Sequence, residues 1–229
     1  MNMNSRWALI VAGGSGIRMG SDTPKQFMLL GSKPVLVHTL EKFADCNIIL
    51  VLPETQIQYW NALKRQYPSV ASLEIQTVVG GDTRSESVRN GLSRIPDDAL
   101  VAIHDGVRPL VSKQLIDRCF ASAEKYGSGV AVTECTDSLR EVDGYKFEDL
   151  PLTHAVDRTR YVLMQTPQTF RAEEIKHSYL CADTTIATDD AMVYEAAGYT
   201  LHLVKGERSN IKITLPVDLR IASAILSAD

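Results

Sequence analysis

The chain has 229 residues, 45% of them hydrophobic, which is enough to bury the core of one domain. Its 24 Lys and Arg against 28 Asp and Glu give a net charge of −4, which argues against broad attraction to nucleic acid or to an anionic membrane. The first apolar run, residues 7–11, is too short for a signal peptide or a membrane span, so we expect a cytoplasmic protein. Four widely spaced cysteines show no metal-ligand pattern: Cys46, Cys119, Cys135 and Cys181.

Short apolar runs alternate with amphipathic stretches over the first part of the chain. Strands are predicted at residues 7–11, 48–52, 73–79, 100–103 and 129–132. Helices are predicted between them around residues 35–44, 57–67, 88–95 and 115–123, the last closed by Gly127. This alternation indicates an α/β fold of Rossmann-like type: a single domain over residues 1–229, with a mostly parallel sheet and helices on both faces.

The alternation stops after residue 132. Residues 136–157 are polar, and Asp143-Gly144, between residues 138–142 and 145–147, predicts a hairpin with a type I′ turn. Such a hairpin cannot build its own core, so it is either a loose excursion or, as we favour, a β-arm that docks on a partner chain. Beyond it we expect a strand at 162–164, a helix after Phe170, a helix from an N-cap at Thr188 to Gly198, a strand at 199–204 and a helix at 217–226.

The loop after the first strand, residues 12–20, contains four glycines, whose backbone N–H groups can wrap closely around an oxyanion. It lacks the Gly-Lys-Ser/Thr of a Walker motif, and Met19 stands where a dinucleotide-binding loop has its third glycine. Residues 20–24 stay irregular instead of opening a helix, so Arg18 and Lys25 would supply the positive charge for a phosphate. The alternative is a solvated turn with two surface cations.

Polar segments also follow the later predicted strands. Residues 80–88 carry Asp82, which is placed to cap the next helix, and Asp105 and Arg108 follow the fourth strand as a carboxylate and a guanidinium. Each feature alone has a structural explanation, as a helix cap or as an ion pair. Two more polar interruptions end apolar stretches at residues 165–170 and 210–214. Because ligands of parallel sheets bind beyond the carboxyl ends of the strands, we expect residues 12–25, 80–87 and 105–109 to lie at that edge.

In chain order, from residue 7 to residue 226, these segments together resemble the cytidylyltransferase family, most closely its members that act on 2-C-methyl-D-erythritol 4-phosphate in isoprenoid precursor synthesis. The resemblance implies a nucleotidyltransferase fold and a reaction in which the acceptor phosphate attacks the α-phosphate of CTP. The products would be the CDP-linked alcohol and pyrophosphate. Mg²⁺ is the implied cofactor, and CTP and a phosphorylated polyol are the implied ligands.

The resemblance also implies roles for residues that match the motifs of the family. The implied catalytic residues are Arg18, Lys25, Arg158 and Lys212. The implied nucleotide-binding residues are Ala12, Gly13, Gly14, Gly16, Gly81, Asp82, Ser87 and Asp105. The implied acceptor-binding residues are Asp105, Arg108, Ser138, Arg158 and Lys212, and Asp105 is the candidate for a metal contact, although the metal would be held mainly by phosphates. The acceptor phosphate is largely ionised at neutral pH, so positioning and electrostatics would matter more than a general base.

In this family the polar hairpin is a dimer arm, which implies a homodimer in which Ser138 and Arg158 complete the site of the partner. The sequence departs from the family pattern at several positions. Val11 replaces a proline, Gly13 an alanine, Gly106-Val107 an Ala-Ala pair, and Ser138 a threonine. These changes preserve size class or hydroxyl chemistry, so they leave catalysis intact and the choice of acceptor open.

Three alternatives remain. A ribitol 5-phosphate cytidylyltransferase would share most motifs, but the compact 105–108 segment and the lack of an insertion near Gly81 favour the methylerythritol acceptor. An inactive nucleotide-binding regulator would not be expected to retain the four catalytic cations. A dinucleotide-dependent oxidoreductase is disfavoured by Met19 and by the missing helix after the glycine loop.

Overall fold

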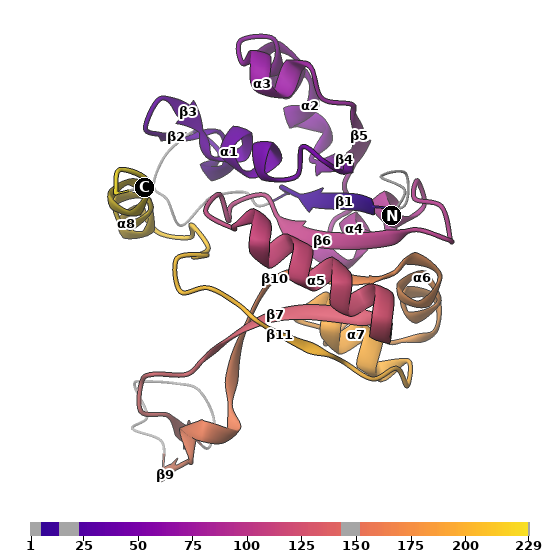
Figure 1. Ribbon diagram of the computed structural model, residues 1–229, viewed down its shortest axis with the longest axis vertical. Helices are drawn as coiled ribbons and strands as arrows, with labels where there is room; N and C mark the ends of the chain where they lie inside the picture. The colour runs from indigo at the N-terminus through magenta and orange to yellow at the C-terminus, as the bar shows by residue number, and fades with distance from the viewer. Residues whose placement is uncertain (1–5, 14–22, 143–151, 229) are drawn as a thin grey trace.

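A seven-stranded sheet forms the centre of the computed structural model, which describes residues 6–13, 23–142 and 152–228 (Figure 1). The strands lie in the order β11 (Leu203–Lys205), β7 (Ser128–Glu134), β10 (Val162–Arg171), β6 (Leu100–Asp105), β1 (Arg6–Val11), β4 (Asn47–Leu52) and β5 (Ile75–Val79). Only β10 runs antiparallel to its neighbours among these strands. The predicted α/β class and the mostly parallel sheet are therefore confirmed.

Helices cover both faces of this sheet because the central strands alternate their apolar side chains between two cores. Ala8 and Ile10 of β1 face one core, and Leu9 faces the other. The first core is covered by α1 (Val35–Lys42), α2 (Glu54–Lys64), α3 (Pro68–Ala71) and α5 (Lys113–Tyr126). The second core is covered by α4 (Arg84–Leu92), α6 (Ala172–Cys181) and α7 (Asp190–Ala196). None of the helices in the described ranges combines the length and hydropathy that a bilayer crossing requires.

Smaller elements complete the body. A short turn of 3-10 helix, η3 (Lys25–Phe27), precedes the two-stranded ribbon of β2 (Leu29–Leu30) and β3 (Lys33–Pro34). The closing helix α8 (Pro216–Leu226), expected from the sequence, packs against β2. A third small core joins this corner to the loop after β6 through Leu30, Val107 and Ile213.

Two predicted helix caps are wrong by one residue. Thr83, rather than Asp82, caps α4, since its hydroxyl accepts from the Glu86 N–H while the Glu86 side chain accepts from the Thr83 N–H. Asp189, rather than Thr188, caps α7 through the N–H of Met192. The predicted end of α5 is confirmed, because Gly127 adopts a left-handed conformation with φ of 94°.

Several strand boundaries also differ from the predictions. β5 begins at Ile75 instead of residue 73, and β11 covers Leu203–Lys205 instead of residues 199–204. β10 extends from the predicted 162–164 to Arg171 and thus includes Pro167. The proline is tolerated because the register with β7 shifts between Met164 and Gln168, where the ladder is interrupted.

The arm projects from the body between the end of β7 and the start of β10 (Figure 1). It contains an antiparallel pair, β8 (Arg140–Val142) with β9 (Thr153–Ala155), in which Val142 lies opposite Thr153. A hairpin is therefore present, but the predicted pairing is wrong, because β8 pairs with Thr153–Ala155 and not with residues 145–147. Those residues and the Asp143-Gly144 turn lie outside the described ranges.

The strand registers bring the polar segments to one edge of the sheet. Val11 lies opposite both Val51 and Asp105, and Leu52 lies opposite Val79. The chain leaves β6 with the Gly106 N–H bonded to the Val11 carbonyl, at 2.9 Å. The loops after β1, β5 and β6 therefore meet beyond the carboxyl ends of their strands, as expected for a parallel sheet.

Candidate active site

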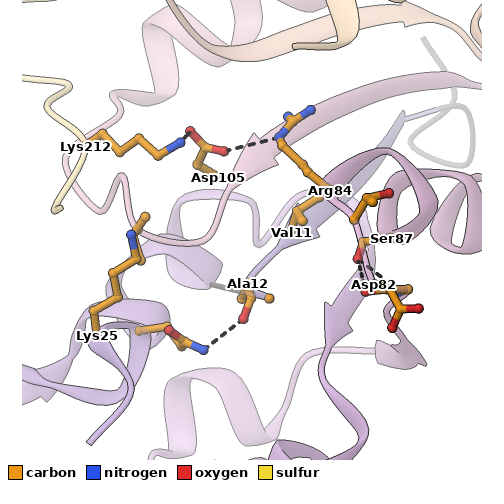
Figure 2. A pocket seen from close by; sticks show the side chains of 13 residues that line it. Val11, Ala12, Lys25, Asp82, Arg84, Ser87, Asp105 and Lys212 are labelled. Atoms are coloured by element: carbon orange, nitrogen blue, oxygen red, sulfur yellow. Dashed lines mark hydrogen bonds and ion pairs between the residues drawn. The ribbon is translucent and has the colours of Figure 1, made fainter. Parts of the chain in front are cut away.

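A cavity of about 290 Å³ lies where these loops meet (Figure 2). Eight of the predicted site residues line it: Ala12, Gly13, Lys25, Gly81, Asp82, Ser87, Asp105 and Lys212. They come from five separate segments of the chain. Lys25 reaches the cavity from the side opposite Asp82 and Ser87, with Ala12 between them (Figure 2).

The glycine segment after β5 is held tightly against the start of α4. The Gly81 N–H donates to the Ser87 hydroxyl oxygen over 3.1 Å. A Cβ atom on Gly81 would lie 2.3 Å from the Cβ of Glu86, and one on Gly80 would lie 2.8 Å from the Ser87 hydroxyl oxygen. Close packing therefore requires glycine here. Because Gly81 has no side chain, the wall that it forms on this side of the cavity is flat.

A buried carboxylate faces cations at another wall of the cavity. The Asp105 Oδ2 lies 3.0 Å from the Lys212 Nζ and 3.2 Å from the Arg108 Nε, while Oδ1 lies 4.0 Å from the Arg84 Nε. Burial alone would raise the pKa of the Asp105 carboxyl, but Lys212, Arg84 and Arg108 outweigh it and hold this pKa well below its usual range. Asp105 is therefore an anion, and the surrounding cations outnumber it, which favours phosphate ligands.

Lys25 is positioned by its neighbour. Gln26 is fully buried, and its side-chain amide donates to the Ala12 carbonyl over 2.9 Å and to Gln56 Oε1 over 2.6 Å. These bonds fix η3 to the end of β1, because a buried amide that lost them would remain without partners. Gln26 is not among the residues predicted for the site. Its position next to Lys25 is the one feature of the sequence that could have indicated its role.

A second cavity, of about 230 Å³, shares one wall with the first. The shared residues are Arg84, Asp105 and Lys212. The remaining lining residues are Arg108, Met164, Gln165, Thr166, Gln168, Thr188 and Asp189. Two adjoining polar cavities with a charged wall in common can hold two ligands with their reactive groups side by side.

The loop that carries Lys212 is anchored to β10 and to the segment after β6. The Asn210 side chain is buried and donates to the Thr166 carbonyl over 2.8 Å. The Arg108 guanidinium donates to the Asn210 carbonyl over 2.9 Å, and the Gln165 amide donates to the Glu207 carbonyl over 2.8 Å. The polar interruptions at residues 165–170 and 210–214 thus hold each other in place.

Five predicted site residues remain, of which three are outside the described residues and two line neither cavity. Arg18, Gly14 and Gly16 are outside the described residues. Ser138 and Arg158 are exposed on the arm, line neither cavity, and Arg158 donates to the carbonyl of Thr136. Arg84 lines both cavities although it is not among the predicted site residues; it lies within the glycine-containing segment 80–88.

The residues present do not by themselves form a metal site. Among the described residues, no three His, Cys, Asp or Glu side chains are grouped to hold a metal ion. Asp105, the predicted contact, directs both carboxylate oxygens at cations. A divalent ion in this cavity would therefore need most of its oxygen ligands from a bound phosphate or from water.

The departures from the family pattern can now be placed. Gly106 is required by its surroundings, because a Cβ there would lie 2.8 Å from the Cβ of Ala12. Val107 is buried and lines the first cavity, not the second. Among the described residues, the nearest atom to a Cβ on Gly13 would be the Ser87 hydroxyl oxygen at 4.0 Å, so these residues leave room for alanine there. Val11, Gly13 and Val107 therefore fall on the first cavity, whereas Gly106 and Ser138 line neither cavity.

Comparison with known proteins identifies the family. Residues 7–228 match the model of the family described as 2-C-methyl-D-erythritol 4-phosphate cytidylyltransferase. Proteins of that name from Porphyromonas gingivalis and Bacteroides thetaiotaomicron are 48% and 46% identical to this chain; the alignments cover 97% and 95% of it and 98% of each relative.

Solved structures agree with this family match. The 4-diphosphocytidyl-2C-methyl-D-erythritol synthase of Anaerococcus prevotii superimposes with a TM-score of 0.81 at 28% identity, over 99% of this chain and 97% of that one. The 2-C-methyl-D-erythritol 4-phosphate cytidylyltransferase of Thermus thermophilus gives a TM-score of 0.78 at 29% identity, over 96% and 98% of the two chains. The chain therefore belongs to the 2-C-methyl-D-erythritol 4-phosphate cytidylyltransferase family.

Proposed function

We propose that this protein transfers the cytidylyl group of CTP to 2-C-methyl-D-erythritol 4-phosphate and releases pyrophosphate, a step in the synthesis of isoprenoid precursors. Membership of the family supports this activity. The single structural observation that carries it is the wall of Arg84, Asp105 and Lys212, which is common to two polar cavities. A nucleotidyl transfer needs two phosphorylated ligands whose phosphates meet at such a wall.

In this proposal the first cavity takes CTP. The cytosine and ribose lie against the flat wall of Gly81, Asp82 and Ser87, and the triphosphate extends toward Lys25, with Arg18 as a further cation. The second cavity takes the acceptor, whose phosphate is held near Lys212 and Arg108. This placement of the acceptor phosphate is supported by the positive charge that is concentrated around Asp105.

The reaction follows from this placement. An oxygen of the acceptor phosphate forms a bond to the α-phosphorus of CTP. The bond from that phosphorus to the bridging oxygen of pyrophosphate breaks, and pyrophosphate leaves with the bonding electrons. Lys25 and Lys212 stabilise the added negative charge of the transition state. This electrostatic stabilisation is strongest in a partly dehydrated site. Because the acceptor phosphate is already ionised, no general base is required.

Magnesium belongs to this proposal as a companion of the triphosphate. CTP would bring the ion into the first cavity on its phosphate oxygens, since Mg²⁺ is commonly bound through substrate phosphates and water. The described side chains include no group of three His, Cys, Asp or Glu residues that could hold the ion without the triphosphate.

We also propose that the active form is a homodimer assembled through the arm. The base of the arm exposes a run of apolar side chains at Tyr161, Val162, Leu163 and Met164, and Leu152 is 76% exposed. Ser138 and Arg158 lie on the arm away from both cavities, so they can serve catalysis only in the site of a second copy. A dimer would cover the apolar run and deliver both side chains together.

A cytoplasmic location is part of the same proposal. All four cysteines are free thiols, and Cys46 and Cys119 have pKa values raised to about 12 by burial. Such a set of unpaired thiols is typical of a reducing compartment, where CTP is also available.

Phosphorus NMR tests the activity directly. Purified protein, CTP, MgCl₂ and 2-C-methyl-D-erythritol 4-phosphate should yield pyrophosphate and a new diphosphodiester with two coupled resonances, in equal amounts. Pyrophosphate without the diphosphodiester would indicate hydrolysis and contradict the transfer. No consumption of CTP with any polyol phosphate would favour the inactive regulator.

A further inference from the structure

Arg84 connects the shared wall to a buried anchor, Asp190, at the start of α7. Its two terminal nitrogens donate to the two carboxylate oxygens of Asp190 over 3.0 and 2.6 Å. Asp190 is fully buried and also accepts from the Tyr179 hydroxyl over 2.7 Å. The third nitrogen of Arg84, Nε, faces Oδ1 of Asp105 at 4.0 Å. A planar guanidinium thus bridges two carboxylates, one structural and one in the site.

Three cations face Asp105, namely Lys212, Arg108 and Arg84. Two of them, Lys212 and Arg84, line both cavities, and these two differ in their freedom to move. The Lys212 side chain is 41% exposed and reaches Asp105 through a single flexible ammonium contact. Arg84 cannot leave Asp190 without stranding a carboxylate that has no contact with solvent. When a phosphate enters, Lys212 can therefore turn toward it, whereas Arg84 must stay.

From this difference we infer that Arg84, anchored by Asp190, is a positioning residue of the transfer reaction: it keeps Asp105 neutralised and in place while Lys212 transfers its contact from Asp105 to the reacting phosphates. The inference rests on the proposed function and deepens it. Arg84 also begins α4, next to the Gly81–Ser87 contact that forms the flat wall. Its anchor therefore fixes the relative position of both walls of the first cavity.

A purely structural role would make a different prediction for a double variant. Arg84→Gln alone leaves Asp190 buried without its cation, so the protein should lose stability as well as activity. Arg84→Gln combined with Asp190→Asn removes both charges and lets the two side-chain amides bond to each other. The double variant should therefore recover most of the lost stability. If Arg84 serves only the fold, activity should return with it.

The experiment measures unfolding midpoints in urea and steady-state kinetics with CTP and 2-C-methyl-D-erythritol 4-phosphate for these variants. We expect the double variant to unfold close to the wild-type midpoint but to keep a kcat reduced by about 30-fold or more, with a KM for CTP changed by less than about 5-fold. Arg89→Gln, on the same helix but outside both cavities, is the control and should behave as wild type.

Two outcomes are decisive in different ways. A double variant that turns over at the wild-type rate would overturn the inference and leave the proposed function intact. Wild-type protein that transfers nothing from CTP in the same assay would overturn the proposed function, and the inference with it. A double variant with restored stability and reduced kcat supports the positioning role.

Discussion

Asp105 and Lys212 lie far apart in the sequence, yet the Lys212 Nζ is 3.0 Å from the Asp105 Oδ2. This ion pair joins the end of β6 to the loop before α8 and stands in the wall that both cavities share. The ion pair with a carboxylate keeps the lysine in position before a ligand binds. An incoming phosphate can then form a stronger ionic contact with the lysine. The arrangement explains how one side chain can serve both ligands.

Removal of either lysine of the first cavity should mainly slow the chemical step. Lys212→Ala and Lys25→Ala are each expected to lower kcat by about 10²-fold, because each removes a preorganised charge from the transition state. Pyrophosphate release under saturating substrates measures the effect. Lys113→Ala, which breaks an exposed pair with Asp45 outside both cavities, is the matched control. Unchanged rates for Lys25→Ala or Lys212→Ala would refute the role of that lysine.

Two glycines of the first cavity should respond oppositely to alanine. Gly81→Ala forces a Cβ into the Cβ of Glu86, so the wall must shift, and the KM for CTP should rise by about 10-fold or more. Gly13→Ala comes no closer than 4.0 Å to any atom of the described residues and should change that KM by less than about 3-fold. Titration of each variant with CTP separates the two cases. Equal effects would mean that the Gly81–Ser87 wall does not contact the nucleotide.

Gln26 should influence catalysis through Lys25. Gln26→Met keeps the volume but removes both amide bonds, which leaves the Ala12 carbonyl without this donor. We expect a loss of roughly 1–3 kcal/mol in the free energy of unfolding and a kcat lowered by about 10-fold. Gln66→Met, at an exposed position after α2, should change neither quantity. A variant that loses stability but keeps kcat would show that η3 holds Lys25 without this bond.

Acid should weaken the fold through His104, which is fully buried beside Thr166 and the Arg108 carbonyl. Burial lowers the pKa of its imidazole from 6.5 to about 4, so the unfolded chain takes up the proton first. Stability from this group is complete above pH 6.5 and falls as the pH drops toward 4, by at most about 1.4 kcal/mol per pH unit.

The variant His104→Gln isolates this contribution. Its free energy of unfolding in urea, measured between pH 7 and pH 4.5, should depend less on pH than that of the wild type, whatever its value at pH 7. The same slope in both proteins would show that the proton is taken up elsewhere. Asp105 is expected to contribute only in stronger acid, because its pKa also lies below the usual range.

The sequence predicted the parts of the fold that depend on local patterns. Alternating apolar runs located the strands of the central sheet, and Gly127 marked the end of α5. The caps were missed because Asp82 and Thr83 both carry suitable oxygens, and the choice depends on the reciprocal bond with Glu86. The extension of β10 through Pro167 depends on a register shift with β7, which only the assembled sheet reveals.

The sequence predicted the site residues that belong to motifs. It did not predict the residues whose role depends on contacts with distant parts of the chain. Asp105 and Lys212 were found through strand ends and family motifs. Arg84 was overlooked because its importance depends on Asp190, which is 106 residues away and was read as part of an ordinary helix. Gln26 was overlooked for the same reason, since its partners Ala12 and Gln56 lie on other elements.

The acceptor that we propose is 2-C-methyl-D-erythritol 4-phosphate. The most direct measurement is a competition in which CTP reacts with an equimolar mixture of this compound and ribitol 5-phosphate, and the two CDP-alcohols are separated and quantified. The product ratio gives the ratio of kcat/KM values, and we predict that it favours the methylerythritol product by about 10²-fold or more. A ratio that favours CDP-ribitol would contradict the account.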